Sequence, residues 1–320
     1  MARLVALTGA TGFVGSHAAR VFAESGWNVR VLARRLPSNA LLASVDPELI
    51  VGDLDDAPAL QALVRGADVV VHAAGAVRAL DAVGFYRANA QGTASVVSAV
   101  QREAPQTRLI LVSSLSAREP TLSDYAGSKR AGEVEVERAG TALDWSIIRP
   151  PAVYGPGDRE LLPFFQMARR GWLAAPANGD AHVSLIHADD LARAIMALAT
   201  ASGCQGATLE VDDGTEGGYG WPAIAKILSG TVGCPVRLIR VPRSPVYGLA
   251  SLVERQARRH GRPPMVNRGK VREFWHPDWV ARSAEFRSRT GWSPQIPVNK
   301  GFSETYRSLQ AAGLLPKSAV

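Results

Sequence analysis

The chain has 320 residues, of which 47% are hydrophobic and 20% are charged, and its net charge is +7. Its two cysteines form neither a disulfide framework nor a zinc spacing, and no apolar run reaches the roughly 20 residues of a membrane span. This composition argues against secreted, membrane-spanning and structural-zinc proteins, so we expect a cytoplasmic globular protein without a signal peptide or a bound metal.

The first 200 residues alternate short apolar runs with longer helical patterns. Strands that are apolar throughout are buried on both faces, which is typical of a parallel sheet covered by helices. We therefore predict an α/β fold, a doubly wound parallel sheet of the Rossmann type. The expected strands are Leu4–Leu7, Asn28–Ala33, Glu48–Val51, Asp68–His72, Arg108–Ser113 and Trp145–Arg149, and the expected helices are Val14–Ser25, Ala59–Val64, Ala88–Glu103 and Tyr125–Ala139.

The first expected strand runs into a turn that contains Gly9, Gly12 and Gly15. Glycines let the backbone approach a pyrophosphate, and the N-terminus of the following helix offers free N–H groups and a positive dipole. The spacing G-x-x-G-x-x-G is not the common G-x-G-x-x-G, so a turn that serves only packing is the alternative. We expect this loop to bind a dinucleotide through Gly9, Thr11, Gly12, Phe13, Val14 and Gly15.

The end of the second strand carries no carboxylate, although an NAD-binding site usually places one there to bind the ribose 2′-hydroxyl. Arg34 and Arg35 stand at this position instead. A guanidinium can bind a 2′-phosphate with two hydrogen bonds, so Arg34 favours NADP(H), with NAD(H) as the second choice and an exposed surface pair as the alternative.

Further cofactor contacts are expected after the third and fourth strands and in the next helix. Asp53 can accept a hydrogen bond from the adenine amino group, or it can be a simple turn residue. The segment that follows the fourth strand presents bare backbone to the adenine ribose. The candidates in this group are Asp53, Leu54, Ala73, Ala74, Gly75 and Asn89.

Catalytic candidates follow the fifth strand, which ends at Ser113 and Ser114. Tyr125 lies eleven residues beyond Ser114, and Lys129 follows four residues later, on the same face of an expected helix. A free tyrosine has a pKa near about 10, and a neighbouring ammonium favours the phenolate. We expect Lys129 to lower the pKa of Tyr125 and to reach the nicotinamide ribose, Ser114 to hold the substrate oxygen, and Ser113 to contact the cofactor.

The pattern loosens after Arg149, where prolines divide the chain. Such scattered elements predict a smaller α+β lobe without a complete core of its own. We therefore expect a Rossmann domain over 1–158, to which 182–212 return, and a substrate lobe over 159–181 and 213–320. The expected strands are His182–Ile186, Thr208–Val211 and Val236–Val241, and the expected helices are Ala188–Ala199, Trp221–Ser229 and Ser244–Arg259.

The lobe has several candidate substrate contacts and an excess of positive charge. From Arg255 onward the chain has 13 Lys/Arg and four Asp/Glu, which suits a solvated surface, an anionic substrate or an anionic membrane. No nucleic-acid-binding module accompanies this charge, so we expect no nucleic-acid partner. Peripheral membrane contact through 244–259 and core packing both explain the apolar face of that helix. The candidate substrate contacts, for which filling of the lobe core is the alternative, are Arg159, Phe164, Trp275 and His276.

These motifs, together with the segments 149–158 (RPPAVYGPGD) and 186–191 (IHADDL), resemble those of the extended short-chain dehydrogenase/reductases. That superfamily includes NAD(P)-dependent epimerases and dehydratases, 3β-hydroxysteroid dehydrogenase-like proteins and carbonyl reductases. The resemblance implies a Rossmann domain, a small C-terminal substrate lobe and a homodimer. It also implies that Pro150, Ala152 and Val153 lie near the nicotinamide carboxamide.

Two departures from the sugar-nucleotide members of that superfamily bear on the reaction. The gap between Ser114 and Tyr125 is short, and Leu115 and Ser116 stand where sugar dehydratases have an acidic pair. We therefore predict an NADP(H)-dependent oxidoreductase that interconverts a small-molecule ketone or aldehyde and its alcohol, with Tyr125 as general acid and base. The alternatives are an NAD-dependent sugar-nucleotide epimerase and a non-catalytic, nucleotide-binding assembly protein.

Overall fold

The computed structural model describes residues 2–35, 40–177 and 181–316. At its centre lies a sheet of seven described strands, all parallel, in the order β11-β6-β5-β4-β1-β2-β3. This arrangement confirms the predicted doubly wound fold. The strands are β1 (Leu4–Thr8), β2 (Asn28–Ala33), β3 (Glu48–Val51), β4 (Val69–His72), β5 (Arg108–Val112), β6 (Trp145–Arg149) and β11 (Ala207–Glu210).

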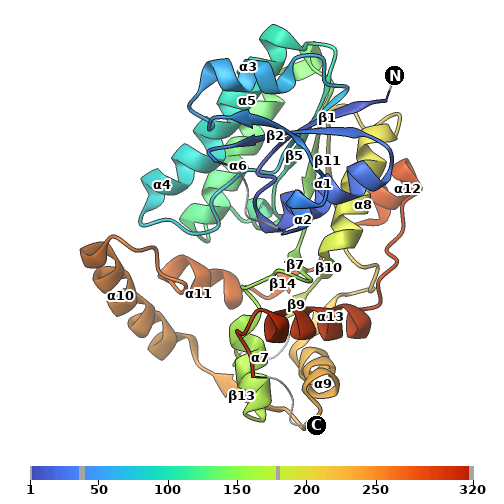
Figure 1. Cartoon of the computed structure of the whole chain (residues 1–320). Helices are drawn as coiled ribbons and strands as arrows, with labels where there is room; N and C mark the ends of the chain where they lie inside the picture. The colour runs from blue at the N-terminus through green and yellow to red at the C-terminus, as the bar shows by residue number, and fades with distance from the viewer. Residues whose placement is uncertain (1, 36–39, 178–180, 317–320) are drawn as a thin grey trace.

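Helices cover both faces of this sheet (Figure 1). Successive side chains of a strand point to opposite faces, so Val5 and Leu7 of β1 join one buried cluster, whereas Ala6 between them joins the other. This two-sided burial is the reason why the strands are largely apolar. The first cluster packs under α1 (Phe13–Glu24), α2 (Ala40–Ala43) and α8 (Ala188–Thr200), and the second under α3 (Ala57–Val64), α5 (Gly92–Glu103) and α6 (Asp124–Glu137).

The lobe lies beyond the sheet and contains its own cluster of buried side chains, including Tyr154, Phe165, Trp221, Phe302 and Tyr306. The expectation that the lobe lacks a complete core is therefore wrong. The reason is that the last described helix, which the sequence pattern did not predict, closes the cluster from the C-terminal end. The main elements are α7 (Leu162–Arg169), β8 (Trp172–Pro176), α9 (Trp221–Val232), β13 (Arg237–Val241) and α13 (Val298–Ala311).

Short elements join the lobe to the sheet. The single strand expected at 182–186 is two strands, because residues 182–183 pair with 219–220 and 278–279, whereas residues 185–187 pair with 152–154. The remaining described strands are β7 (Ala152–Tyr154), β9 (His182–Val183), β10 (Leu185–His187), β12 (Tyr219–Gly220) and β14 (Asp278–Trp279). The other described helices of the C-terminal part are α10 (Arg243–His260), which is long and lies at the edge of the molecule, α11 (Arg268–Phe274) and α12 (Ala284–Thr290).

The helix expected at 88–103 begins differently. A short helix, α4 (Ala82–Tyr86), leads into the π-helical turn η1 (Arg87–Gln91), and α5 then continues the same rod. Two short 3₁₀ helices, η2 (Leu115–Arg118) and η3 (Gly140–Ala142), complete this half. Among the described residues, no helix combines the length and the apolar character that crossing a membrane requires.

Candidate active site

The glycine loop connects β1 to α1 at the carboxyl edge of the sheet. Gly9 has a φ of +74°, and a Cβ there would lie 2.4 Å from the backbone nitrogen of Ala74. A Cβ on Gly15 would lie 2.2 Å from the carbonyl oxygen of Gly9. Both positions therefore require glycine, because the loop packs directly against the backbone of Ala73 and Ala74.

The N-terminus of α1 is open to a ligand. Its N-cap is Gly12, which has no side-chain cap, and no acidic residue stands in the first turn. Thr11 and Gly12 are exposed, and Phe13 and Val14 are half-buried. Uncapped N–H groups at the positive end of a helix fit the pyrophosphate of a dinucleotide. The loop thus provides a cradle that added side chains would fill.

The predicted adenine end lies after β2 and β3. Arg34 and Arg35 are exposed, and neither forms an ion pair within the described ranges. Asp53 is exposed, and its Oδ1 accepts a hydrogen bond from the backbone nitrogen of Asp55 at 2.9 Å. Leu54 covers Gly92, where a Cβ would lie 2.6 Å from the Cδ1 of Leu54. Asp53 thus has a local turn role.

Asn89 lies in the π-helical turn η1, a geometry that recurs at functional sites. Its buried amide nitrogen donates to the carbonyl of Ala76 at 3.0 Å and to Ser128 Oγ at 2.9 Å. Its Oδ1 accepts from the backbone nitrogen of Ala76 at 2.8 Å and lies 2.7 Å from where a Cβ on Gly75 would be. Asn89 therefore anchors the loop at 75–76 to α6 and leaves Gly75 as bare backbone.

Tyr125 and Ser114 meet beside the end of β5. Burial raises the pKa of Tyr125 to about 12, although a hydrogen bond with the Ser114 side chain acts in the opposite direction. The carboxylates of Glu273 and Glu160 raise the pKa further. The expectation of a lowered pKa for Tyr125 is therefore wrong, because the cost of burying a phenolate outweighs the contacts that favour it. Tyr125 keeps its proton at neutral pH.

Lys129 is buried one helical turn beyond Tyr125. Its Nζ donates to the carbonyl oxygen of Val112 at 2.8 Å, at the end of β5. Burial lowers the pKa of Lys129 to about 8, while the carboxylate of Glu133 raises it. The ammonium is therefore fixed at the carboxyl edge of the sheet, between the strand end and α6.

A network of charged side chains around the buried Glu133, which the sequence analysis did not predict, lies one helical turn after Lys129. Glu133 is fully buried and accepts hydrogen bonds from Arg149 Nε at 2.8 Å, from Arg149 Nη2 at 2.6 Å and from Ser113 Oγ at 2.5 Å. The Ser113 hydroxyl therefore faces this network rather than a cofactor. The signal in the sequence was the spacing, since Glu133 follows Lys129 by four residues on the same helical face.

The remaining predicted contacts lie on the lobe side. Pro150 is buried, Val153 is half-buried and Ala152 is exposed, where β7 pairs with β10. Arg159 is exposed and forms no ion pair with any described residue.

The predicted aromatic contacts are packed on other rings of the lobe. Phe164 and Trp275 contact the ring of Phe274 at centroid distances of 6.2 and 5.3 Å. The rings of His276 and Trp279 are in tilted contact at a centroid distance of 4.6 Å. The structure thus brings three of the four substrate candidates into aromatic contacts.

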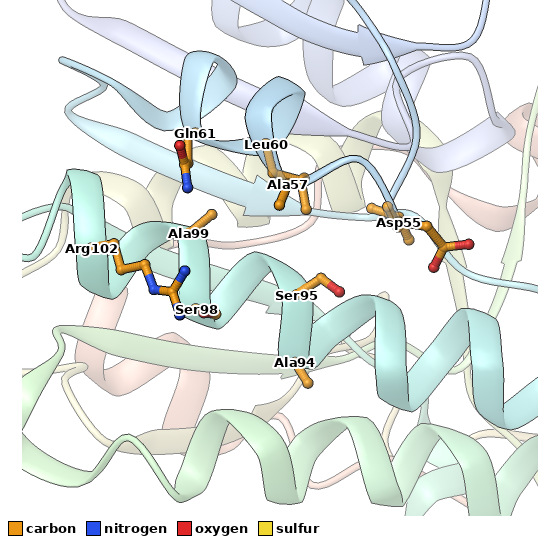
Figure 2. Close-up of a pocket in the computed structure, with 10 residues that line it drawn as sticks. Asp55, Ala57, Leu60, Gln61, Ala94, Ser95, Ser98, Ala99 and Arg102 are labelled. Atoms are coloured by element: carbon orange, nitrogen blue, oxygen red, sulfur yellow. The ribbon is translucent and has the colours of Figure 1, made fainter.

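A groove lies on the outer helical layer, between α3 and α5 (Figure 2). Small and apolar side chains line most of it, with Asp55 and Arg102 as its charged residues. Leu54 is the predicted cofactor residue that reaches it. The groove contains none of the residues of the Tyr125 site.

The model of the NAD dependent epimerase/dehydratase family matches residues 5–211, a segment that includes the glycine loop, Ser114, Tyr125 and Lys129. The chain belongs to this family. The resemblance to the extended short-chain dehydrogenase/reductases is thereby confirmed, and the protein is an NAD(P)-dependent oxidoreductase. The family is described as NAD dependent.

Several family members match almost the whole chain. A protein named ceramide reductase from Caulobacter vibrioides is 38% identical over 320 residues, covering 99% of this chain and 98% of that protein. A 2-alkyl-3-oxoalkanoate reductase from Stenotrophomonas maltophilia is 27% identical and covers 93% and 96%. Among solved structures, gox2253 superposes with a TM-score of 0.76 at 23% identity, over 98% of this chain and all of that one. The match to gox2253 shows that the two proteins share a fold.

Proposed function

We propose that the chain is an NADP(H)-dependent reductase that converts a ketone in an alkyl-chain lipid of ceramide type to its alcohol. The relative named ceramide reductase matches from end to end, and the second reductase is named for a substrate with alkyl chains and a 3-oxo group. The observation that carries the reaction is the contact between Ser114 and a Tyr125 that retains its proton.

A protonated Tyr125 suits the direction of reduction. A bound reduced nicotinamide would supply the hydride to the carbonyl carbon. The carbonyl oxygen accepts hydrogen bonds from Ser114 and Tyr125, and Tyr125 transfers its proton as negative charge develops on that oxygen. Lys129, held by the carbonyl of Val112, then stabilises the phenolate by its charge.

The cofactor would lie along the carboxyl edge of the sheet. The loop from Gly9 to Gly15 holds the pyrophosphate, Asp53 and the backbone of 73–75 hold the adenosine half, and Ala152 and Val153 border the nicotinamide. Arg34 supports NADP(H), because its guanidinium is exposed and can bind a 2′-phosphate with two hydrogen bonds.

The substrate would be held by the lobe, for which we keep the predicted bounds of 159–181 and 213–320. Phe164, Trp275 and His276 lie in a region rich in aromatic rings, which suits an alkyl chain. Arg159 is exposed and can meet a polar head group.

The test is to follow NADPH oxidation by the purified protein with the keto form of a ceramide. We expect stoichiometric oxidation, and a loss of roughly 10²- to 10⁴-fold in kcat for Tyr125→Phe, with NADPH binding retained. Tyr86→Phe is the matched control, because it removes the same hydroxyl from an exposed position on the neighbouring helix α4.

Two outcomes would refute the proposal. Unchanged NADPH oxidation in Tyr125→Phe would remove Tyr125 from the chemistry. Protein that is purified with bound NAD, and that converts a sugar nucleotide without a net change in nicotinamide absorbance, would be an epimerase instead.

A further inference from the structure

Helix α10 has an apolar face that no described part of the chain covers. Of its eighteen residues, Ala250 is the buried one, and Leu249 and Leu252 are 62% and 60% exposed. Met265 and Val266, in the loop that follows, are also exposed. We call these four residues the α10 surface. Figure 1 shows α10 at the edge of the molecule, away from the sheet.

The opposite face of α10 explains why the helix is nevertheless fixed. Glu254 forms an ion pair with Arg268 at 2.8 Å, and the hydroxyl of Tyr247 accepts from Arg272 at 3.5 Å. These contacts join α10 to α11 and orient the α10 surface outward. Leu249 and Leu252 are therefore exposed because the contacts with α11 orient the helix in this way.

Positive charge borders this apolar surface. Arg255, Arg258 and Arg259 are exposed in the second half of α10, and in the described residues none of them has a carboxylate partner. Apolar side chains beside unpaired arginines suit a bilayer with anionic head groups, where the arginines bind phosphates and the leucines enter the acyl boundary. A second copy of the chain would bring like charges together, which disfavours that alternative.

The hairpin of α10 and α11 is connected to the predicted catalytic tyrosine. In α11, Glu273 accepts a hydrogen bond from Ser123, and the ammonium of Lys270 lies 6.0 Å from the centre of the Tyr125 ring. A Cβ on Gly269 would lie 2.7 Å from the Cβ of Ser123, so α11 packs tightly against the start of α6. The helix that carries the exposed leucines is thus one helix removed from Tyr125.

The other side of Tyr125 is also bordered by exposed apolar residues. Phe85 of α4 contacts the Tyr125 ring at a centroid distance of 6.1 Å. Val83 of the same helix, and Leu80 just before it, are exposed. In Figure 1, α4 and the α10–α11 hairpin lie on the same side of the molecule. Tyr125 therefore lies between two segments that both present apolar side chains to the surroundings.

We infer that the α10 surface docks the protein on an anionic membrane and thereby places the Tyr125 site at the bilayer, where a lipid ketone can enter it. This inference deepens the proposed function, since it states how that site receives its substrate. The occupant of the α10 surface is the acyl boundary of the bilayer, and the arginines bind its phosphates.

Vesicle flotation tests the docking itself. The intact protein is expected to float with phosphatidylcholine vesicles that contain phosphatidylglycerol, to float poorly with pure phosphatidylcholine, and to be released by salt. The double variant Leu249→Asp/Leu252→Asp should bind at least roughly tenfold less. Replacing Arg255, Arg258 and Arg259 by Gln should weaken binding by about fivefold per arginine.

Val51→Asp is the matched control, because Val51 is 64% exposed at the end of β3, in the sheet rather than in the lobe. Leu249→Asp should lose vesicle binding and Val51→Asp should not. The inference would be overturned if phosphatidylglycerol did not increase the vesicle binding of the wild type. It would also be overturned if the two variants bound vesicles equally well. Light scattering that finds a dimer which the Leu249→Asp/Leu252→Asp variant converts to monomers without any vesicle binding would overturn it as well.

Turnover measurements separate this inference from the proposed function. A short, water-soluble 3-oxo ester should be reduced at the same rate by the wild type and by Leu249→Asp/Leu252→Asp, whereas a ketone embedded in vesicles should be reduced more slowly by the variant. Equal loss with both substrates would contradict membrane delivery. If the wild type binds vesicles but oxidises no NADPH with either ketone, the reductase proposal fails and the docking stands.

Discussion

The sheet and the lobe are both closed by buried side chains, but the sheet is assembled mainly from regular strand–helix units. The sheet cluster on the α1 side draws on such units from Val5 to Val211, and Phe286 and Trp292 join it from the C-terminal part of the chain. The lobe cluster joins Tyr154 and Phe165 to Phe302 and Tyr306, which arrive with the last described helix. The half that carries Tyr125 is thus built mainly from repeated strand–helix units, whereas the lobe is built from scattered elements that a distant helix completes.

Two phenylalanines allow this difference to be tested directly. Phe22 is fully buried under the sheet, and Phe302 is buried in the lobe. Each replacement by Ala should cost about 3–5 kcal/mol of unfolding free energy, because a large cavity remains. Phe302→Ala should retain NADPH binding and lose ketone turnover, whereas Phe22→Ala should lose both.

Denaturant unfolding followed by tryptophan fluorescence, together with NADPH titration, measures both effects. If both variants lost NADPH binding equally, the sheet and the lobe would unfold as one cooperative unit, and the contrast between them would not hold.

The same difference explains how much could be predicted. The strands at 28–33, 48–51 and 145–149 have the expected bounds, because each is a short run rich in the large and β-branched apolar residues that favour strands. Helix α13 was not predicted, although Phe302, Tyr306 and Leu309 share one of its faces. Three large apolar residues in a polar segment indicate a buried helix only when the residues that they pack against, such as Tyr154 and Phe165, are known.

The candidate site divides in a similar way. Ser114, Tyr125 and Lys129 could be selected because they stand at fixed spacings within 16 residues of one another. The groups that raise the pKa of Tyr125 include Glu273, which lies in the lobe sequence. No local pattern connects Glu273 to Tyr125, so the sign of that pKa shift could not be predicted from the sequence.

Glu133→Gln tests how strongly the sheet half depends on its buried network. Gln keeps the shape but leaves the half-buried guanidinium of Arg149 without its bidentate carboxylate. We expect a loss of about 1–3 kcal/mol in unfolding free energy, measured by urea titration. Glu137→Gln is the control on the same helix, since Glu137 pairs with Arg130 near the surface and should change stability by less than about 1 kcal/mol. Equal effects of the two replacements would mean that the network is not important for stability.

Arg34→Ala tests the cofactor preference, which belongs to the sheet half alone. Removing the guanidinium should raise the Kd of NADPH by about tenfold, because a charge-assisted contact to the 2′-phosphate is lost. The Kd of NADH should stay unchanged. Arg65→Ala is a suitable control, as Arg65 is exposed and pairs with Glu103 on the helical layer. Equal wild-type affinity for both cofactors would contradict the preference for NADP(H).

The smallest expected effect is a shift in the pH profile, and it connects the two regions at Tyr125. Because the pKa of Tyr125 is about 12, its proton is retained across the neutral range, so the titration that matters is that of Lys129, with a pKa of about 8. Reductive kcat/KM should be level near neutrality and fall above about pH 8 as the ammonium loses its proton. Glu133 raises the pKa of Lys129, so Glu133→Gln should move this fall to lower pH. Lys129→Arg, which stays charged, should remove the fall. If the pH profile of Glu133→Gln fell at the same pH as that of the wild type, Lys129 would not be the titrating group.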